Sequence, residues 1–440
     1  FFLFGFLNQM KALFALIFSL SWTILLNAQN SMPLDSLGFQ FEKVKEICKR
    51  DDGKLWGKSL YGPILVINKT LKWVVANQPD SLGQLKKIGN VYVGKYPENS
   101  IVACGVTSFA GRSWMVMTYP FDAEDSFELY RIYIHESFHR IQEDLGLNCN
   151  GYNNRHMDKM EARIYLDLEW QALLKAIISS DEDRNIAIKD ALLFRQARRQ
   201  LFPGADTMES RFEIHEGLAD YTAFKLCCNS ETELKEKLLK RKSWYINNEG
   251  SCVRTFGYFS GFLYAYLLDE TGTSWQKKLK CGDDLGTLLQ HLLKIDLSID
   301  TSNWFNQSKS RYPYEDICNQ ELKIHNKKEK ILSDYKIKFT QKSVLQIDLI
   351  SASYGIYSSP YPIDSLGAVY PVIDISDKWG ILKVKEGGCL ISKSAVVTAE
   401  GLIIDNQSIQ GQGWTLKLNN DWSILKQGNN YIIKENINAP

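Results

Sequence analysis

The fold is decided by a short stretch that reads Ile134-His135-Glu136-Ser137-Phe138-His139-Arg140, an H-E-x-x-H pattern. On a helix, side chains four positions apart lie on one face, so His135 and His139 can direct their imidazole nitrogens at one point. Glu136 lies about 100° further round the helix, close enough to reach a water molecule at that point without occupying a ligand position. Metal-assisted hydrolysis needs this combination of an electrophilic ion, a water of lowered pKa and a carboxylate that takes its proton.

The residues around this pattern favour a helix. Asp125 can cap its N-terminus, and Glu128 can complete a capping box. No Gly or Pro interrupts residues 127–145. The alternative interpretation is a solvent-exposed helix that carries two His by chance, in a chain with six His. A zinc site needs a third protein ligand beside two His, so the rest of the chain decides between these interpretations.

A second motif offers that ligand. Residues 213–221 read E-I-H-E-G-L-A-D-Y, within a helical segment that begins near Met208. Glu216 and Asp220 are four positions apart on one face, so Glu216 can ligate the metal while Asp220 accepts a hydrogen bond from a ligating His. His215 points about 100° away from Glu216, which suits a contact with substrate or a position behind the ligands.

Together, H-E-x-x-H and E-G-L-A-x-Y resemble the motifs of the gluzincin metallopeptidases, the group of thermolysin and the zinc aminopeptidases. The resemblance covers residues 135–139 and 216–221. It implies a zincin-like α+β catalytic region, Glu136 as general base, Asp220 as a support, and Zn²⁺ held by His135, His139 and Glu216. The spacing departs from thermolysin, because 76 residues lie between His139 and Glu216; some membrane-bound gluzincins have a comparably long insertion.

Spacing alone favours a different third ligand, Glu161, which lies 22 residues after His139. Local context favours Glu216, because it is followed one turn later by the acidic Asp220, whereas Glu161 is followed by Tyr165. An acidic group in that position orients a ligating histidine and raises its basicity. We therefore expect Glu216 to be the ligand.

Gluzincins also use a Tyr or His to stabilise the oxyanion of the tetrahedral intermediate, and the resemblance implies such a residue from another segment. Residues 256–264 read F-G-Y-F-S-G-F-L-Y, in which the small residues allow a helix to pack closely against the site. Tyr258 is the first candidate for the oxyanion donor and Tyr264 the second. The alternative is that both are core aromatics.

Residues 1–28 are expected to be a cleaved signal peptide. A short basic region at residues 10–11 precedes the almost wholly apolar residues 12–26, and Ala28 offers a small residue at a cleavage site. Residues 1–9 are expected to be an over-extension upstream of the true start. The alternative is a membrane anchor formed by the same segment. The expected location is secreted or periplasmic, with no membrane contact in the mature form.

Residues 30–125 are expected to be the β-rich N-terminal part of the catalytic unit. After one short helix, β-type runs bounded by turn residues occupy residues 64–67, 71–75, 91–93, 101–103 and 114–119. In gluzincins an edge strand beside the active-site helix pairs with the extended peptide substrate. By that resemblance, and because a peptide can add to a sheet edge, residues 114–119 are a candidate substrate strand; the alternative is an ordinary core strand.

The remaining chain divides into three parts. Residues 126–318 read as mostly helical, with helices expected at residues 159–178, 181–202, 209–228, 231–245, 254–270 and within 274–294. The charged residues 319–338 are expected to be a linker or a solvent-exposed helix. Residues 339–440 change to a hydrophobic period of two and predict a small antiparallel β domain, interpreted as a sandwich. In it, hairpins are expected at residues 379–391 and around a turn at 427–429.

Composition limits the partners. Lys and Arg total 52 against 51 Asp and Glu, a net charge of +1, so the sequence suggests neither nucleic acid nor an anionic membrane as a partner. The nine Cys include no C-x-x-C pair, so a Cys-rich zinc site is not expected. Several free thiols and one or two disulfides are expected.

The sequence therefore predicts a secreted zinc-dependent hydrolase, with a peptide or protein as substrate. One alternative is a non-catalytic metal-binding protein with the same fold. Glu136 argues against it, because a purely structural site has no use for a carboxylate beside its ligands. The other is a zinc hydrolase that acts on a non-peptide amide or ester. The cleavage specificity and the oligomeric state are left open.

Overall fold

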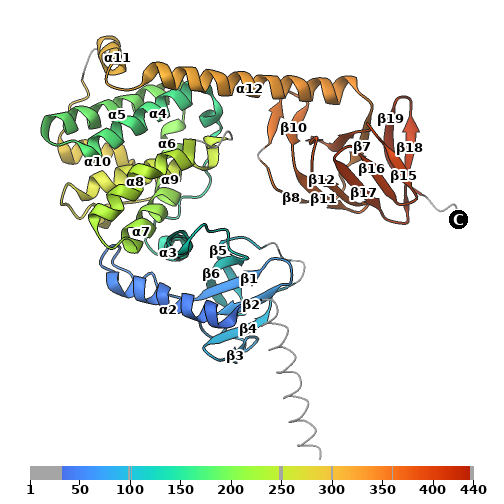
Figure 1. Cartoon of the computed structure of the whole chain (residues 1–440), viewed down its shortest axis with the longest axis horizontal. Helices are drawn as coiled ribbons and strands as arrows, with labels where there is room; N and C mark the ends of the chain where they lie inside the picture. Colours follow the sequence, from blue (N-terminus) through green and yellow to red (C-terminus); the bar gives the residue numbers. More distant parts are fainter. Residues whose placement is uncertain are drawn as a thin grey trace, which may run out of the picture. The chain divides into compact units, whose positions relative to one another are not determined.

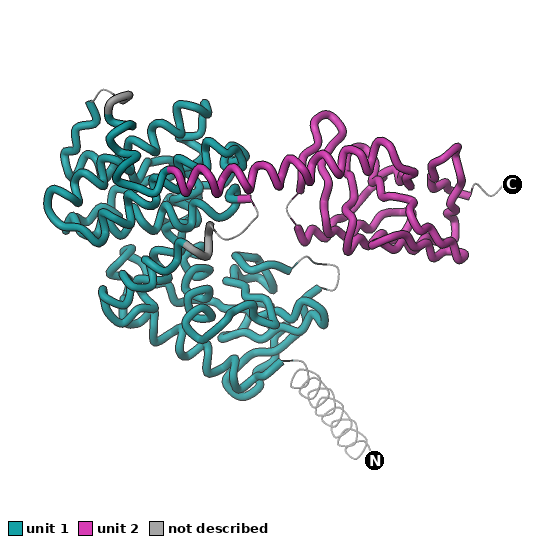
Figure 2. The backbone as a smooth tube through the Cα atoms, turned by 45° about the horizontal axis from the view of Figure 1, so that its top comes forward, with its two compact units in different colours: residues 1–248, 252–314 teal, residues 249–251, 315–440 magenta. Residues whose placement is uncertain are grey.

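The computed structural model has a mixed α+β architecture of helices and three sheets (Figure 1). It describes residues 32–97, 100, 102–246, 251–298, 301–358 and 360–436. The expected signal peptide, residues 1–28, lies outside the described residues. By its internal contacts the chain divides into two units, residues 1–248 with 252–314 and residues 249–251 with 315–440 (Figure 2).

The first unit starts with α2 (Leu34–Asp51) and continues into a six-stranded sheet of order β3-β4-β2-β1-β6-β5. Its strands are β1 (Ile64–Asn68), β2 (Trp73–Ala76), β3 (Lys86–Ile88), β4 (Val91–Lys95), β5 (Gly105–Phe109) and β6 (Arg112–Tyr119). β1, β2, β4 and β6 follow predicted runs, whereas β3 and β5 were not predicted. The run at 101–103 is not a strand at residues 102 and 103, and Ile101 lies outside the described residues.

Strand β6 lies inside this sheet. It pairs with β1 in parallel through residues 115–119 and with β5 in antiparallel fashion through residues 112–116. Residues 114–116 of the predicted substrate strand are therefore interior, whereas residues 117–119 are paired with β1 alone in the strand register. A substrate role for residues 117–119 stays a prediction. Residues 114–117 are all buried, as is typical of a strand covered on both faces. The edge position beside β6 belongs to β5.

Helix α3 (Ser126–Gln142) carries the H-E-x-x-H pattern and lies between the sheet and the other helices (Figure 1). It contacts β5 and β6 on one side and α7 on the other. The helical elements that follow are η1 (Arg155–Asp158), α4 (Met160–Ile178), α5 (Asp181–Leu201), α6 (Ala205–Phe212), η2 (Glu213–Gly217), α7 (Leu218–Cys227), α8 (Glu231–Ile246), η3 (Cys252–Arg254), α9 (Phe256–Asp269), η4 (Trp275–Lys278), α10 (Leu285–Leu293) and α11 (Thr301–Lys309). The predicted helices α4, α5, α8 and α9 are confirmed, and α11 was not predicted.

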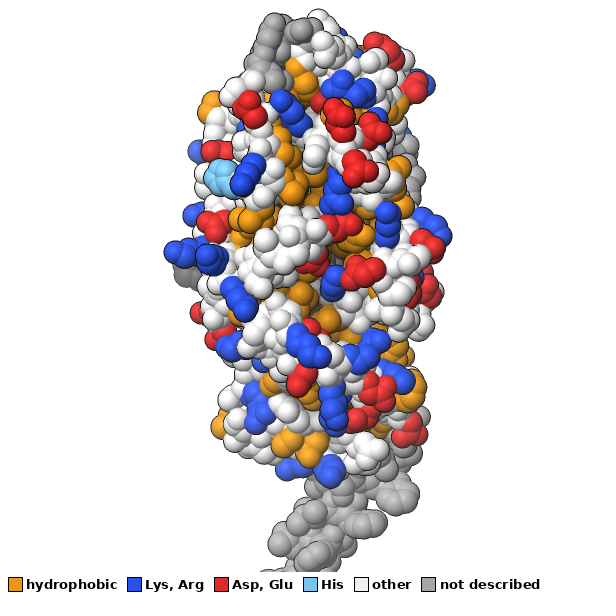
Figure 3. Space-filling view, turned by 90° about the vertical axis from the view of Figure 1, so that its left-hand side faces the viewer, with side chains coloured by type: hydrophobic (Ala, Val, Ile, Leu, Met, Phe, Trp, Pro, Cys, Tyr) orange, Lys and Arg blue, Asp and Glu red, His pale blue; other side chains and the backbone are white. Residues whose placement is uncertain are grey.

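One disulfide joins Cys149, in the loop after α3, to Cys281, in the loop before α10. The other seven cysteines of the described chain are thiols outside disulfides. This agrees with the expectation of one or two bridges and several free thiols. On the face drawn in Figure 3, acidic and basic side chains are interspersed. Among the described residues, no helix is both long enough and apolar enough to cross a membrane.

The second unit contains most of α12 (Tyr314–Gln341), so the expected linker at residues 319–338 is helical. Two sheets follow, of order β18-β19-β7-β14-β13-β10-β9 and β15-β16-β17-β12-β11-β8. Their strands are β7 (Val344–Asp348), β8 (Ser353–Ile356), β9 (Tyr361–Ile363), β10 (Gly367–Tyr370), β11 (Ile373–Asp377), β12 (Gly380–Val384), β13 (Cys389–Ile391), β14 (Ser394–Thr398), β15 (Ile403–Asp405), β16 (Ser408–Gly411), β17 (Trp414–Leu418), β18 (Trp422–Gln427) and β19 (Asn430–Glu435).

The two sheets share one core, in which Leu345 and Val397 of the first meet Leu382 and Leu416 of the second. This confirms the predicted sandwich. The hairpin predicted at residues 379–391 is wrong, because β12 pairs within one sheet and β13 within the other. The Glu-Gly-Gly turn instead carries the chain between the sheets. The hairpin predicted around residues 427–429 is confirmed as β18–β19.

Candidate metal centre

Helix α3 begins where the sequence predicts it. Asp125 accepts a hydrogen bond from the backbone N–H of Glu128 at 2.8 Å and so caps the helix. The Glu128 carboxylate, expected to complete a capping box, instead binds Arg131 at 2.8 Å and Arg241 at 3.1 Å. The helix then continues without interruption through the H-E-x-x-H pattern.

The second motif lies where a helical run changes its hydrogen-bonding pattern. Between α6 and α7 stands the π-helix η2, in which the N–H of Leu218 donates to the carbonyl of Glu213. A π-turn inserts one residue and leaves carbonyls without their usual helical partner. Here the side-chain amide of Gln142 donates to the carbonyls of Ile214, at 3.2 Å, and His215, at 2.8 Å. The sequence predicted a single helix and did not predict the π-helix.

Glycines hold this turn against α9. A Cβ atom on Gly217 would lie 2.5 Å from the carbonyl oxygen of Gly257 and 2.6 Å from the Cα of Gly261. No side chain fits into that space, so the two backbones approach directly. The contact brings Tyr258 of α9 next to Glu216, as the small residues of the 256–264 segment had suggested.

His135, His139 and Glu216 bring three ligand atoms together. The two Nε2 atoms are 3.1 Å apart, and each lies 3.3 Å from Glu216 Oε2. A tetrahedral zinc with ligands at about 2.0–2.1 Å requires ligand atoms roughly 3.3–3.4 Å apart, so the three atoms fit such an ion. Glu161, the rival ligand, is exposed on α4 and lies outside this cluster.

Hydrogen bonds fix the tautomer of each histidine. His135 Nδ1 lies 2.9 Å from Asp220 Oδ1, and His139 Nδ1 lies 2.7 Å from Gln142 Oε1. The amide nitrogen of Gln142 is committed to two carbonyls, so its oxygen must face His139. Both acceptors therefore require a proton on Nδ1, which leaves the Nε2 lone pair of each ring free for a metal.

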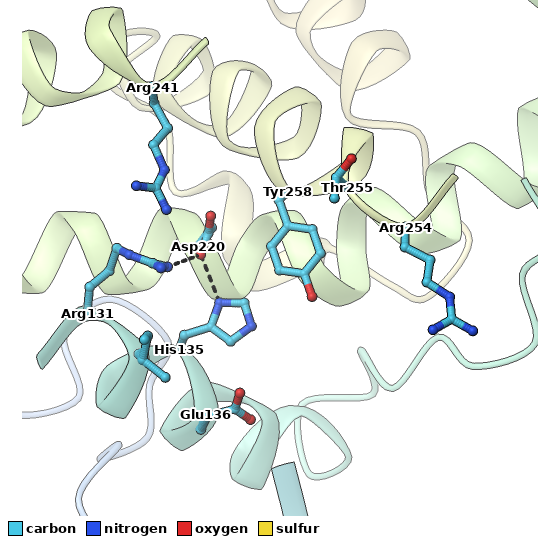
Figure 4. Close-up of a pocket in the computed structure, with 9 residues that line it drawn as sticks. Arg131, His135, Glu136, Asp220, Arg241, Arg254, Thr255 and Tyr258 are labelled. Carbon is cyan, nitrogen blue, oxygen red and sulfur yellow. Dashed lines mark hydrogen bonds and ion pairs between the residues drawn. The ribbon is translucent and has the colours of Figure 1, made fainter. Parts of the chain in front are cut away.

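Asp220 is almost fully buried, with a side-chain exposure of 1%, and a buried carboxylate needs a compensating charge. Arg131 supplies it, because its Nη1 donates to Asp220 Oδ1 at 2.7 Å. The same oxygen faces His135 Nδ1, so Arg131, Asp220 and His135 form a chain of contacts (Figure 4). Asp220, which the sequence predicted to support the metal ligands, is thus itself held in place by Arg131.

A second buried network holds the other end of η2. The guanidinium of Arg195 binds the carboxylate of Glu213, the first residue of η2, with one contact at 2.7 Å. Arg198 contacts Glu209 at 2.8 Å on the preceding helix. All four side chains are at most 3% exposed. This network connects α5 to the segment that carries Glu216.

A cavity of about 250 Å³ opens beside the cluster and is lined by His135, Glu136 and Tyr258 together with three arginines. Burial raises the pKa of Glu136 above its usual value. The ring of Tyr258 stacks on His135, with centroids 5.5 Å apart and an angle of 7° between the planes. The pKa of Tyr258 is raised by burial, by the charge of Glu216 and by a hydrogen bond to Glu216. The hydroxyl of Tyr258 therefore stays protonated.

Two other candidates from the sequence lie elsewhere. Tyr264 is buried, and its hydroxyl donates to Glu169 at 2.7 Å within the core, so it does not face the cavity. His215 lies beside His139, with ring centroids 4.9 Å apart, and its Nε2 is 3.8 Å from Glu216 Oε1. Burial lowers the pKa of His215 to about 4, which keeps this ring neutral at pH 7.

The sequence did not single out Gln142 or Arg131. Their positions offered a signal, since Gln142 follows His139 by three positions and Arg131 precedes His135 by four, which places each beside a candidate ligand on the helix. No protein family, curated protein or solved structure matches this chain.

Proposed function

We propose that the chain is a zinc-dependent hydrolase that cleaves peptide bonds, with a gluzincin-like centre. The observation that carries this proposal is the convergence of His135 Nε2, His139 Nε2 and Glu216 Oε2 within 3.1–3.3 Å of one another. With both Nδ1 atoms hydrogen-bonded to acceptors, the two Nε2 atoms and the carboxylate oxygen face one another and need a positive charge between them. In the metal-free chain a proton on His135 can supply that charge, because burial lowers the pKa of His135 but hydrogen bonds to Asp220 and Glu216 raise it by more, to about 10. In the proposed working protein a bound cation supplies it instead.

The donor set favours zinc. Two imidazoles and one carboxylate with an open fourth position are typical of catalytic zinc sites, whereas a structural site is usually closed by four protein ligands. A bound Zn²⁺ would supply a Lewis acid and lower the pKa of a water molecule at that open position. Co²⁺ or Mn²⁺ are expected to substitute in vitro.

Two side chains of this protein have roles in the proposed reaction. Glu136 lines the cavity next to His135 but is not part of the ligand cluster. It takes a proton from the attacking water and later gives it to the leaving amine. Tyr258 lines the same cavity with a protonated hydroxyl that hydrogen-bonds Glu216. In the proposed reaction this O–H turns from Glu216 and donates its hydrogen bond to the developing oxyanion.

We propose that an extended peptide binds along an edge of the first sheet. Strand β5 is the edge of the sheet and contacts α3, the helix that carries Glu136. A substrate strand can pair with such an edge through backbone hydrogen bonds. This favours a peptide over a small amide or ester. Strand β5 thus joins residues 117–119 of β6 as a candidate for the substrate-binding edge.

We also propose that the protein works in a secreted or periplasmic location. The Cys149–Cys281 disulfide supports this, because disulfides persist in oxidising compartments. Sequencing of the mature N-terminus tests it, with Gln29 or a neighbouring residue expected as the first. Retention of residues 10–25 in the mature soluble protein contradicts it.

The test of the hydrolase function is removal and return of the metal. The purified chain is treated with a chelator, checked for metal content and incubated with a peptide library, before and after one equivalent of Zn²⁺ is added. We expect cleavage only with zinc, detected by mass spectrometry. An intact library at full zinc occupancy contradicts the proposal and favours a non-catalytic metal-binding protein.

A further inference from the structure

We propose that the cavity beside Glu136 accepts a carboxylate of the substrate and that Arg254 recognises it. The inference rests on the proposed hydrolase function and adds a substrate class, namely peptides with an acidic side chain or a free C-terminal carboxylate near the scissile bond. It starts from the cavity wall, where three of nine lining residues are arginines: Arg131, Arg241 and Arg254. In Figure 4, Arg131 and Arg241 lie on one side of Tyr258 and Arg254 on the other.

Two of these arginines are already committed to carboxylates of the protein. Arg131 contacts Glu128 at 2.8 Å and Asp220 at 2.7 Å, and Arg241 contacts Glu128 at 3.1 Å. Their side chains are only 10% exposed. These pairs leave little charge for a ligand, so Arg131 and Arg241 form a fixed wall of the cavity and not its recognition group.

Arg254 differs from Arg131 and Arg241 both in its exposure and in its ion pairs. It is exposed at the end of η3, and within the part of the chain that the structure describes it forms no ion pair or side-chain hydrogen bond. A guanidinium presents parallel N–H donors that match a carboxylate in two-point contact. Because the charge of Arg254 is not used within the described protein, a ligand carboxylate does not have to compete for it.

Arg254 lines the same cavity as the groups that are proposed to react. Arg254 precedes Tyr258 by four residues, across the start of α9, and both line the same cavity. Thr255 lies between them and lines the cavity as well, where the N-terminal end of α9 adds a partial positive charge. The cavity also holds the acidic Glu136, which would repel a carboxylate. The carboxylate is therefore expected at the Arg254 end.

The experiment compares the zinc-loaded wild-type chain with Arg254→Gln. The probes are matched peptides that carry Glu or Gln next to the cleaved bond, and peptides with a free or an amidated C-terminus. The cavity should accept either the side-chain or the C-terminal carboxylate, so one of the two peptide pairs should show the effect. For that pair, we expect the wild type to cleave the charged peptide with a kcat/KM about tenfold or more above that of the neutral peptide, which is the size of one charge-assisted hydrogen bond. Arg254→Gln should remove that preference, so that the charged and the neutral peptide of a pair are cleaved with similar kcat/KM.

The control is Arg155→Gln on η1, which removes an equal charge from an exposed arginine outside the cavity lining. It should keep the preference. Binding of the same peptides to the metal-free chain, measured by fluorescence anisotropy, gives a readout that needs no turnover and should show the same dependence on Arg254.

Two results overturn the inference, and only the second also contradicts the hydrolase function. If the wild type cleaves acidic and neutral peptides equally, or if Arg254→Gln keeps the preference, carboxylate recognition is wrong and the hydrolase function stands. If no peptide of either kind is cleaved at full zinc occupancy, the hydrolase function itself is contradicted, and the inference falls with it.

Discussion

Gln142 Oε1 lies 2.7 Å from His139 Nδ1, while the amide nitrogen of the same side chain lies 2.8 Å from the carbonyl of His215. One buried residue thus links a candidate ligand on α3 to the turn that precedes the candidate ligand Glu216. The carbonyls fix the orientation of the amide, and the amide fixes the tautomer of His139. The π-helix and the histidine ligand are parts of one arrangement.

Replacing Gln142 tests this link. Gln142→Met keeps the approximate size of the side chain but removes its acceptor and its donor. The orientation of His139 is then no longer fixed, and we expect zinc affinity to fall by about 10–100-fold, as for other groups that orient a metal ligand. Competition titration with a chelator measures it. An affinity within about twofold of the wild type would show that Gln142 does not position His139.

The third ligand is tested by a pair of substitutions with the same chemistry. Glu216→Gln removes a carboxylate from the cluster, so zinc affinity should fall by more than the roughly 100-fold upper range for supporting residues. Glu161→Gln changes an exposed carboxylate on α4 and should leave zinc affinity unchanged. Tight zinc in Glu216→Gln together with weak zinc in Glu161→Gln reverses the assignment.

The buried network around η2 predicts a dependence of stability on pH. Burial raises the pKa of Glu209, but Arg198, His156 and Arg199 lower it by more, to well below its usual value. A lowered folded pKa stabilises the protein above the unfolded value of about 4.3, and this stability is lost as pH falls toward the folded pKa. Acid should therefore weaken the contribution of Glu209.

Glu209→Gln measures that contribution. At pH 7 we expect the free energy of unfolding to drop by about 3–5 kcal/mol, because the variant leaves buried arginine charge without its partner. Below pH 4 the difference from the wild type should shrink by about 1.4 kcal/mol per pH unit. Urea denaturation followed by tryptophan fluorescence gives both values. If the difference in unfolding free energy between Glu209→Gln and the wild type stays constant between pH 7 and pH 3, it does not come from the ionised carboxylate of Glu209.

Features set by residues close in sequence could be predicted. Asp125 caps α3, helical spacing places His135 beside His139, and the i,i+4 pair of Glu216 and Asp220 faces the first motif. The first two depend on periodicity within α3, whereas the pair of Glu216 and Asp220 spans the junction of η2 and α7. The spacing to Glu161 was misleading, because chain separation does not determine which helix packs against α3 when whole helices lie between the motifs.

Features set by distant contacts could not be predicted. A mainly apolar run such as residues 114–119 fits an edge or an interior position equally well, and only the pairing with β1 and β5 decides which residues are interior. The turn after β12 reads as a hairpin, although it carries the chain to the other sheet. The π-helix depends on Gln142, which is 71 residues before Glu213 in sequence. Local propensity carries none of this information.

The central claim is that Glu136 acts as a base beside a zinc held by His135, His139 and Glu216. Glu136→Gln keeps the shape of the side chain but cannot accept the proton, so it separates catalysis from metal binding. The most direct measurement is turnover of a confirmed peptide substrate by this variant, with zinc content determined on the same sample. We predict one zinc per chain, as in the wild type, and a rate lower by at least about a hundredfold. Cleavage at the wild-type rate with zinc in place would contradict the account.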